Sequence, residues 1–160
     1  MTEPAFDSAR FRQVLGHFPT GVCIVSAFQD GTPVGMAIGS FFSISLEPPL
    51  VGFCAGKTSS SWAKLRDIGQ FCVSVLADDQ EEVSRRFASK EDDKFAGLAW
   101  DRSPLGSPRL GGALAWIDCR TDAILEGGDH DIVVGAVHDL AVAREAHPLI
   151  FFRGGYGHLA

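Results

Sequence analysis

A lysine and four hydroxyl residues stand in one run, Lys57-Thr58-Ser59-Ser60-Ser61, where an expected helix begins. A lysine ammonium, hydroxyls and the unpaired amides of a first helical turn can all donate hydrogen bonds to an anion. The run therefore fits a phosphate-binding loop. Serine and threonine are also the commonest helix N-caps, so simple capping is the plainer interpretation of this segment alone.

The segment from 35 to 45 is strand-like but holds glycine, alanine and serine where a buried strand usually has large side chains. Glycine inside a strand often marks the close approach of a ligand or of another backbone. The segment can therefore lie against a flat ring. A barrel corner, which needs glycine for curvature, explains the same residues.

His130 follows Gly127-Gly128-Asp129 and precedes Asp131, in a glycine-rich turn. The turn can present the histidine to a second substrate, or it can be ordinary turn chemistry of glycine and aspartate. The five histidines form no HxxxH or HxH pair, so we expect no metal site. The chain also lacks the Gly-x-Ser-x-Gly elbow of hydrolases and a Gly-x-Gly-x-x-Gly turn, so a nicotinamide cofactor would not bind as in Rossmann folds.

Composition favours one cytoplasmic domain spanning 1–160. The chain has 160 residues, a formal net charge of −6 and four cysteines without a CxxC pair. The negative charge argues against nucleic-acid or anionic-membrane partners, which require basic surfaces. The cysteines fit reduced core thiols. No apolar run approaches the roughly 20 residues of a membrane helix, and the first residues do not resemble a signal peptide.

The elements that must position these residues are mostly strands. A helix capped by Asp7 carries apolar residues at helical spacing to Phe18, a second begins at Ser59 or Ser60 with Gly69 at its C′ position, and a third spans 80–89. Long irregular sequence fills 90–112. Strands are expected over 22–28, 34–46, 50–55, 71–76, 113–126, 131–143 and 149–152. Many short strands with three helices between them predict a mainly β fold with a closed or nearly closed barrel.

The chain resembles the short-chain flavin reductases, which have an FMN-binding split barrel of Greek-key type and serve two-component flavin-dependent monooxygenases. The resemblance runs nearly end to end and depends on the whole set of segments. These are 11–22, 40–41, 43–51, Lys57 to Trp62, 71–76, Arg86-Phe87, Asp93-Lys94-Phe95, Gly128-Asp129-His130, Gly135 and 148–156.

This resemblance implies a cytosolic homodimer that reduces FMN or FAD with NADH or NADPH and supplies a separate flavin-dependent oxygenase. It implies three groups of flavin-binding residues and one nicotinamide-binding group, and neither a metal nor a definite catalytic residue. The isoalloxazine would lie along Ala37, Ile38, Gly39 and Ser40. The ribityl chain and phosphate would lie at Cys54, Ala55, Gly56, Lys57, Thr58, Ser59 and Ser60. Arg86 and Phe87 would close over the flavin. The nicotinamide would meet His130, Arg153, Gly154 and Tyr156.

Two rival functions fit a similar barrel. A pyridoxamine-phosphate-type oxidase would also bind phosphate but would not turn over NADH, and a flavin- or haem-binding module would catalyse nothing. Fold alone does not separate them. Oxidation of NADH in the presence of free flavin does.

Overall fold

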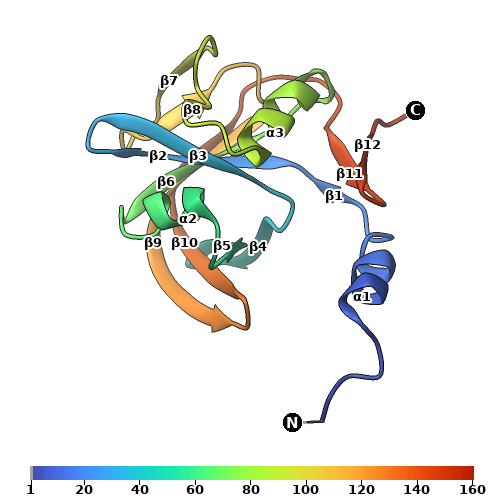
Figure 1. Cartoon of the computed structure of the whole chain (residues 1–160). Helices are drawn as coiled ribbons and strands as arrows, with labels where there is room; N and C mark the ends of the chain where they lie inside the picture. The colour runs from blue at the N-terminus through green and yellow to red at the C-terminus, as the bar shows by residue number, and fades with distance from the viewer. Residues whose placement is uncertain (1) are drawn as a thin grey trace.

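Antiparallel strands dominate the computed structural model, which describes residues 2–160 (Figure 1). The main sheet has seven strands in the order β3-β2-β6-β9-β10-β5-β4. Its strands are β2 (Cys23–Gln29), β3 (Thr32–Ile38), β4 (Phe42–Leu46), β5 (Pro49–Gly56), β6 (Gln70–Val75), β9 (Ala115–Gly127) and β10 (His130–Val142). The prediction of a mainly β fold with added helices is confirmed.

Two small sheets and four helical segments complete the chain. β1 (Thr20–Gly21), β11 (Ile150–Phe152) and β12 (Gly155–Gly157) form one sheet, and β7 (Trp100–Arg102) and β8 (Pro108–Leu110) form a hairpin inside the stretch expected to be irregular. The helices are α1 (Ser8–Leu15), α2 (Ser60–Leu65), the 3-10 turn η1 (Asp78–Gln80) and α3 (Glu81–Ala88).

One connection shows why the sheet must curl into a barrel. The expected single strand over 34–46 is wrong, because the chain leaves β3 at Ile38 and enters β4 at Phe42. These two strands form opposite edges of the seven-stranded sheet. Four extended residue steps span at most about 14 Å, so the two edges must approach each other. No hydrogen-bonded ladder joins β3 to β4 among the described pairings, and the barrel is therefore split at this point.

The strands enclose one core, and α3 covers a second. Inside the barrel, Phe53 makes edge-to-face contacts with Trp62 and Phe71, at centroid distances of 5.9 and 5.3 Å. The other face of β2 packs its Ile24 into a second cluster, which includes Phe87 of α3. β2 is thus buried on both faces, which explains its nearly continuous apolar sequence.

Three local expectations have mixed outcomes. Asp7 caps α1 as predicted, accepting a hydrogen bond from the Arg10 amide at 2.8 Å. Gly69 has a φ of 87° but lies beyond the C-terminal cap of α2 at Arg66, so its assignment to the C′ position is wrong. Cys23, Cys72 and Cys119 are free and buried, and burial raises the pKa of each thiol to about 12.

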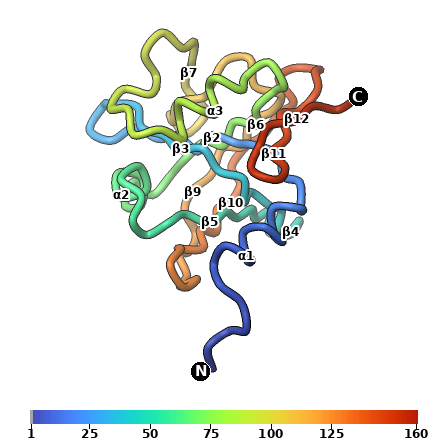
Figure 2. The backbone as a smooth tube through the Cα atoms, turned by 45° about the vertical axis from the view of Figure 1, so that its right-hand side comes forward, coloured from blue at the N-terminus to red at the C-terminus, as the bar shows by residue number. Residues whose placement is uncertain are grey.

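The ends of the chain lie away from the main sheet. α1 projects from the barrel and buries none of its residues, as the tube view also shows (Figure 2). β11 pairs with both β1 and β12, which places the C-terminal hairpin beside the start of the barrel. Within residues 2–160, no helix has the length and apolar character needed to cross a membrane.

Candidate active site

A cleft of about 520 Å³, here called the α2–α3 cleft, opens between β3, the start of α2 and the end of α3. Its lining residues are Met36, Ala37, Thr58, Ser59, Ser60, Ser61, Phe87, Ala88, Ser89, Lys90 and Lys94. Five of them, Ala37, Thr58, Ser59, Ser60 and Phe87, belong to the flavin-binding set inferred from the sequence. The fold therefore brings together residues from three distant segments.

A buried carboxylate anchors the hydroxyl-rich end of this cleft. Asp131 on β10 accepts hydrogen bonds from Trp62 Nε1 at 2.8 Å and from Arg66 Nε at 3.3 Å. The Trp62 hydrogen bond, followed by the Arg66 contact, lowers the pKa of Asp131. Both donors lie on or next to α2, so Asp131 fixes this helix on the barrel. The sequence analysis missed this role, because Asp131 follows a turn that explained its polarity.

The loop before α2 is held by backbone contacts on both sides. Lys57 N donates to the Asp129 carbonyl at 3.0 Å, and Ser59 N donates to the Gly56 carbonyl at 3.0 Å. Ser59 Oγ then accepts from the Trp62 amide at 3.2 Å and is the N-cap of α2. Capping is therefore a real role of Ser59. Thr58 and Ser60 are exposed and line the cleft.

The apolar wall depends on a close fit between Gly35 and Phe87. The Phe87 ring is buried and lies edge-on to Phe95, with centroids 4.9 Å apart. A Cβ atom on Gly35 would lie only 2.7 Å from Phe87 Cε1. At Gly35 the closely approaching group is thus a side chain of the protein itself, and not the ligand or the barrel corner considered from the sequence. Approach of a ligand to the 35–45 segment stays a prediction.

The other residues assigned to the flavin from β3, β5 and the connection after β3 are mostly engaged in the barrel. Ile38 and Ala55 are buried in the barrel core. Ser40 Oγ accepts from the Cys54 amide at 2.9 Å and donates to the Cys54 carbonyl at 3.1 Å, which ties the β3–β4 connection to β5. A Cβ on Gly39 would lie 3.0 Å from Thr20 Oγ1.

The two lysines that line the cleft were not assigned there from the sequence. Lys57 instead forms a salt bridge with Glu126 at the end of β9, and this hydrogen bond raises the pKa of Lys57. Lys90 is exposed at the cleft, whereas Lys94 is buried. Lys94 Nζ donates to Ser61 Oγ at 2.8 Å and to the Phe87 carbonyl at 2.9 Å. Lys94 was visible in the Asp93-Lys94-Phe95 motif, but nothing in the motif indicated its burial.

Arg86 lies on another surface of α3. It lines a separate groove of about 400 Å³ with Glu82 and Leu98 and donates to the Ala96 carbonyl. Among the residues described as lining the α2–α3 cleft, Phe87 is present and Arg86 is not.

His130 lies next to the loop that precedes α2. It pairs with Gly56 across β10 and β5, and its Nε2 would be 3.8 Å from a Cβ on Gly56. His130 Nδ1 is 2.7 Å from Asp129 Oδ1, and because a carboxylate only accepts, the ring N–H donates. This hydrogen bond lowers the pKa of Asp129.

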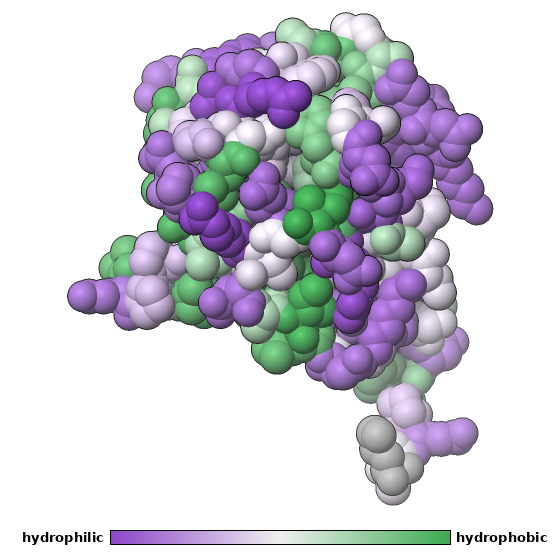
Figure 3. Space-filling view, turned by 90° about the vertical axis from the view of Figure 1, so that its left-hand side faces the viewer, coloured by the Kyte–Doolittle hydropathy of each residue, from purple (hydrophilic) through white to green (hydrophobic). Residues whose placement is uncertain are grey.

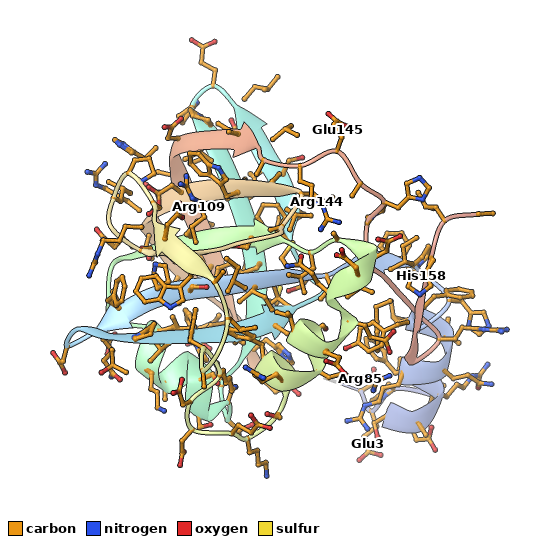
Figure 4. The ribbon with its side chains drawn as sticks, turned by 90° about the horizontal axis from the view of Figure 1, so that it is seen from above. Glu3, Arg85, Arg109, Arg144, Glu145 and His158 are labelled. Carbon is orange, nitrogen blue, oxygen red and sulfur yellow. The ribbon has the colours of Figure 1, made fainter. Side chains whose placement is uncertain are left out.

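The C-terminal residues assigned to the nicotinamide lie elsewhere in this chain. Arg153 and Gly154, with φ values of 49° and 75°, form the β11–β12 turn. Tyr156 Oη is 2.7 Å from Ser84 Oγ, and the Arg85 guanidinium lies 4.8 Å from the Tyr156 ring centroid. Viewed from above, α3 with Arg85 lies beside the C-terminal segment that reaches His158 (Figure 4). Figures 1 and 2 place this hairpin and the β9–β10 tip on different sides of the chain.

Comparison with known proteins identifies the family. The flavin reductase-like domain model matches residues 15–160. The reductase subunit HsaB of a flavin-dependent monooxygenase from Rhodococcus jostii (strain RHA1) is 53% identical over 152 residues, covering 95% of this chain and 78% of that protein.

Solved structures agree with this assignment. Nitrilotriacetate monooxygenase component B from Mycobacterium thermoresistibile superposes with a TM-score of 0.93 at 48% identity, covering 96% of this chain and 87% of that one. The NADH:FAD oxidoreductase SgcE6 of Streptomyces globisporus C-1027, solved with NAD and FAD fragments, gives 0.92 at 35% identity, covering 100% and 96%. The split-barrel prediction is confirmed, and the chain belongs to the flavin reductase-like family.

Proposed function

We propose that this chain is an NAD(P)H:flavin oxidoreductase that binds FMN or FAD in the α2–α3 cleft and supplies reduced flavin to a separate oxygenase. The observation that carries the proposal is the composition of the cleft. Met36, Ala37 and Phe87 provide apolar surface for a ring system, and serines, Thr58 and two lysines provide donors for a phosphate. No carboxylate lines this cleft among the residues described there, so nothing in its lining repels an anion.

The protein's part in this reaction is to bind and orient. Bound flavin supplies the redox chemistry, namely the capacity to accept a hydride from a dihydronicotinamide. Phe87 and Met36 are buried and exclude water from one wall. Thr58, Ser59 and Ser60 remain our proposed ribityl and phosphate contacts, fixed through Asp131 and Trp62. Hydride transfer requires aligned rings at near-attack distance and no strong protein acid or base.

His130 is the proposed nicotinamide contact. Its Nδ1–H is occupied by Asp129, which fixes the ring and leaves Nε2 available beside Gly56. A fixed imidazole with one unused nitrogen suits a hydrogen bond to the carboxamide of a nicotinamide. Within one chain, Arg153, Gly154 and Tyr156 belong to the β11–β12 hairpin and not to the β9–β10 hairpin of His130. Their contact with the nicotinamide is therefore proposed separately from that of His130.

A homodimer is proposed from the apolar surface. Large apolar side chains are exposed on α1, on the turn after it and on the edge strand β4. They are Phe11, Val14, Leu15, Phe18, Phe42, Ile44 and Leu46. Leu46 is 95% exposed, and the amphipathic α1 buries nothing in its own chain. On the side away from α1, by contrast, apolar residues appear as patches set among hydrophilic ones (Figure 3). A second copy would remove the exposed apolar residues from water.

A separate oxygenase is the proposed consumer of reduced flavin. The Rhodococcus relative is named the reductase subunit of a flavin-dependent monooxygenase, which implies an oxygenase component apart from it. We therefore expect this chain to hydroxylate no organic substrate by itself.

One assay tests the proposal against its rivals. The chain is mixed with NADH or NADPH and with FMN or FAD, and absorbance is followed at the nicotinamide band, with flavin-free and protein-free controls. Steady oxidation that depends on both protein and flavin supports the reductase. Absence of oxidation with every nicotinamide–flavin pair overturns it. Oxygen consumption with pyridoxamine phosphate and no NADH would instead support the oxidase.

A further inference from the structure

We infer that Lys94 is the residue that recognises the phosphate of the flavin, so that the cleft selects phosphorylated flavins over riboflavin. The inference rests on the proposed function, because it takes the α2–α3 cleft as the flavin site. It assigns this specificity to Lys94 and not to Lys57, the lysine that adjoins the hydroxyl run in the sequence.

The charge of Lys94 has no carboxylate partner among the described salt bridges. Its side chain is buried, with 9% of the residue exposed, and no described salt bridge includes it. Its two hydrogen-bond partners are a hydroxyl, Ser61 Oγ, and a carbonyl, that of Phe87, both neutral. A buried charge without a counter-ion is unfavourable. An anionic ligand in the cleft would supply the missing charge.

The ammonium of Lys94 has one more donor than its described contacts use. A lysine ammonium has three N–H groups, and the two described contacts of Lys94 use two of them. Lys94 also lines the cleft, so the third N–H can reach a ligand there. Ser61 and the Phe87 carbonyl hold the ammonium in place, and a held donor loses less freedom on binding than a mobile one.

The charged side chains around the cleft favour an anion in it. The charged residues that line the cleft are Lys90 and Lys94, both positive. Glu91 and Asp92 line an adjoining cavity of about 40 Å³ together with Lys64. Lys94 lines both spaces. The two carboxylates line the smaller one, and Glu91 also lines the groove that holds Arg86, but neither is described for the larger cleft. A phosphate in the larger cleft would therefore meet lysines and hydroxyls.

Lys57 is a poorer candidate for the same role. Its ammonium already has a carboxylate partner in Glu126, and the side chain is exposed at the β9–β10 end. Binding a phosphate would require Lys57 to leave this partner. Lys94 would have to leave none.

A purely structural role is the alternative for Lys94, since it joins Ser61 of α2 to the end of α3. The two roles differ in what they predict for riboflavin, which has the ring and ribityl chain of FMN but no phosphate. A structural tie affects both ligands equally. A phosphate contact affects FMN alone.

The test measures the dissociation constants of FMN and riboflavin, from quenching of flavin fluorescence, for the wild type and for Lys94→Gln. The glutamine amide can still donate to Ser61 and to the Phe87 carbonyl but carries no charge. We expect the FMN constant to rise by about tenfold or more, the size of a lost charge-assisted contact, and the riboflavin constant to stay within about twofold. Lys64→Gln, which removes an exposed lysine of the adjoining cavity, is the matched control and should preserve the wild-type ratio.

Each remaining outcome counts for or against the inference. Equal weakening of both flavins by Lys94→Gln makes the lysine a structural tie and overturns the inference. No change in either dissociation constant overturns it too, and so does a Lys64→Gln effect of the same size as that of Lys94→Gln. If Lys94→Gln does not fold, the wild type decides: inorganic phosphate should weaken FMN binding and leave riboflavin unaffected, and the absence of this difference overturns the inference. Failure of the wild type to reduce any flavin would refute the proposed function instead. Because binding constants do not measure reduction, the two failures can be told apart.

Discussion

Replacing Gly35 by alanine tests whether the apolar wall of the cleft is as tightly packed as the structure indicates. The new Cβ would lie 2.7 Å from Phe87 Cε1 and 3.1 Å from the Val25 carbonyl oxygen. Non-bonded carbon atoms favour about 3.5–4.0 Å, so the ring would have to move by about 1 Å. The Val25 oxygen belongs to the backbone of β2, so it can yield less than a side chain. Phe87 must therefore give way.

The size of the effect follows from the burial of that ring. Phe87 is 1% exposed and packs against Phe95, so its displacement disturbs a filled core. Overpacking of this kind costs about 1–3 kcal/mol, and the gain from replacing glycine in a strand offsets about 0.5–1 kcal/mol. A net loss of about 1–2 kcal/mol lowers Tm by roughly 2–8 °C in a chain of this size.

Thermal unfolding by circular dichroism measures this loss, with Gly21→Ala as the control. Gly21 is also in a strand, and a Cβ there would meet nothing within 4 Å, so the control should keep or slightly raise Tm. Gly35→Ala should also weaken FMN and riboflavin alike, since Phe87 lines the cleft. Combining Gly35→Ala with Phe87→Leu should cost less than the sum of the two changes. Equal Tm values for Gly35→Ala and Gly21→Ala would refute the reasoning.

Three further predictions concern the second substrate, the anchor of α2 and assembly. His130→Ala should raise KM for NADH by up to about tenfold, the size of one lost hydrogen bond, with flavin dissociation constants unchanged; wild-type NADH kinetics in the folded variant would make His130 structural. Because the pKa of Asp131 is lowered on folding, its contribution to stability is present above the unfolded carboxyl pKa and is lost as pH falls through the folded value. Asp131→Asn should therefore show a smaller fall in Tm between about pH 6 and pH 3 than the wild type, and parallel curves would contradict this. Light scattering should give twice the chain mass at micromolar concentration, and Leu15→Glu with Phe18→Glu should shift it toward the monomer; a monomeric wild type rules out the dimer.

The features predicted well from the sequence are those fixed by local chemistry. Asp7 caps α1 and Ser59 caps α2, because each hydroxyl or carboxylate reaches an amide three residues ahead. The β9–β10 hairpin forms at the predicted glycines, with Gly128 at a φ of 73° and the turn centred on Gly128 and Asp129. Such signals require no knowledge of the rest of the fold.

The features that were missed depend on contacts between distant segments. The break after Ile38 follows from closure of the barrel, and Ser40 there bonds to Cys54, which belongs to another strand. A serine within a strand-like run does not indicate which distant residue it will contact. The hairpin of β7 and β8 was also not predicted, because two strands of three residues each are too short for an alternating pattern to be recognised.

The same limit applies to the lysine that we infer to bind the phosphate. Lys57 adjoins the hydroxyl run in sequence, but its ammonium pairs with Glu126, which is 69 residues away. Lys94 lies 33 residues beyond Ser61, yet the fold places its ammonium 2.8 Å from that hydroxyl. An exposed lysine can satisfy its charge with a surface carboxylate or with water, whereas a buried lysine without a carboxylate partner is unfavourable until an anion arrives. Proximity in sequence therefore does not identify the lysine that lies beside the hydroxyl run, whereas the fold and the burial of each ammonium do.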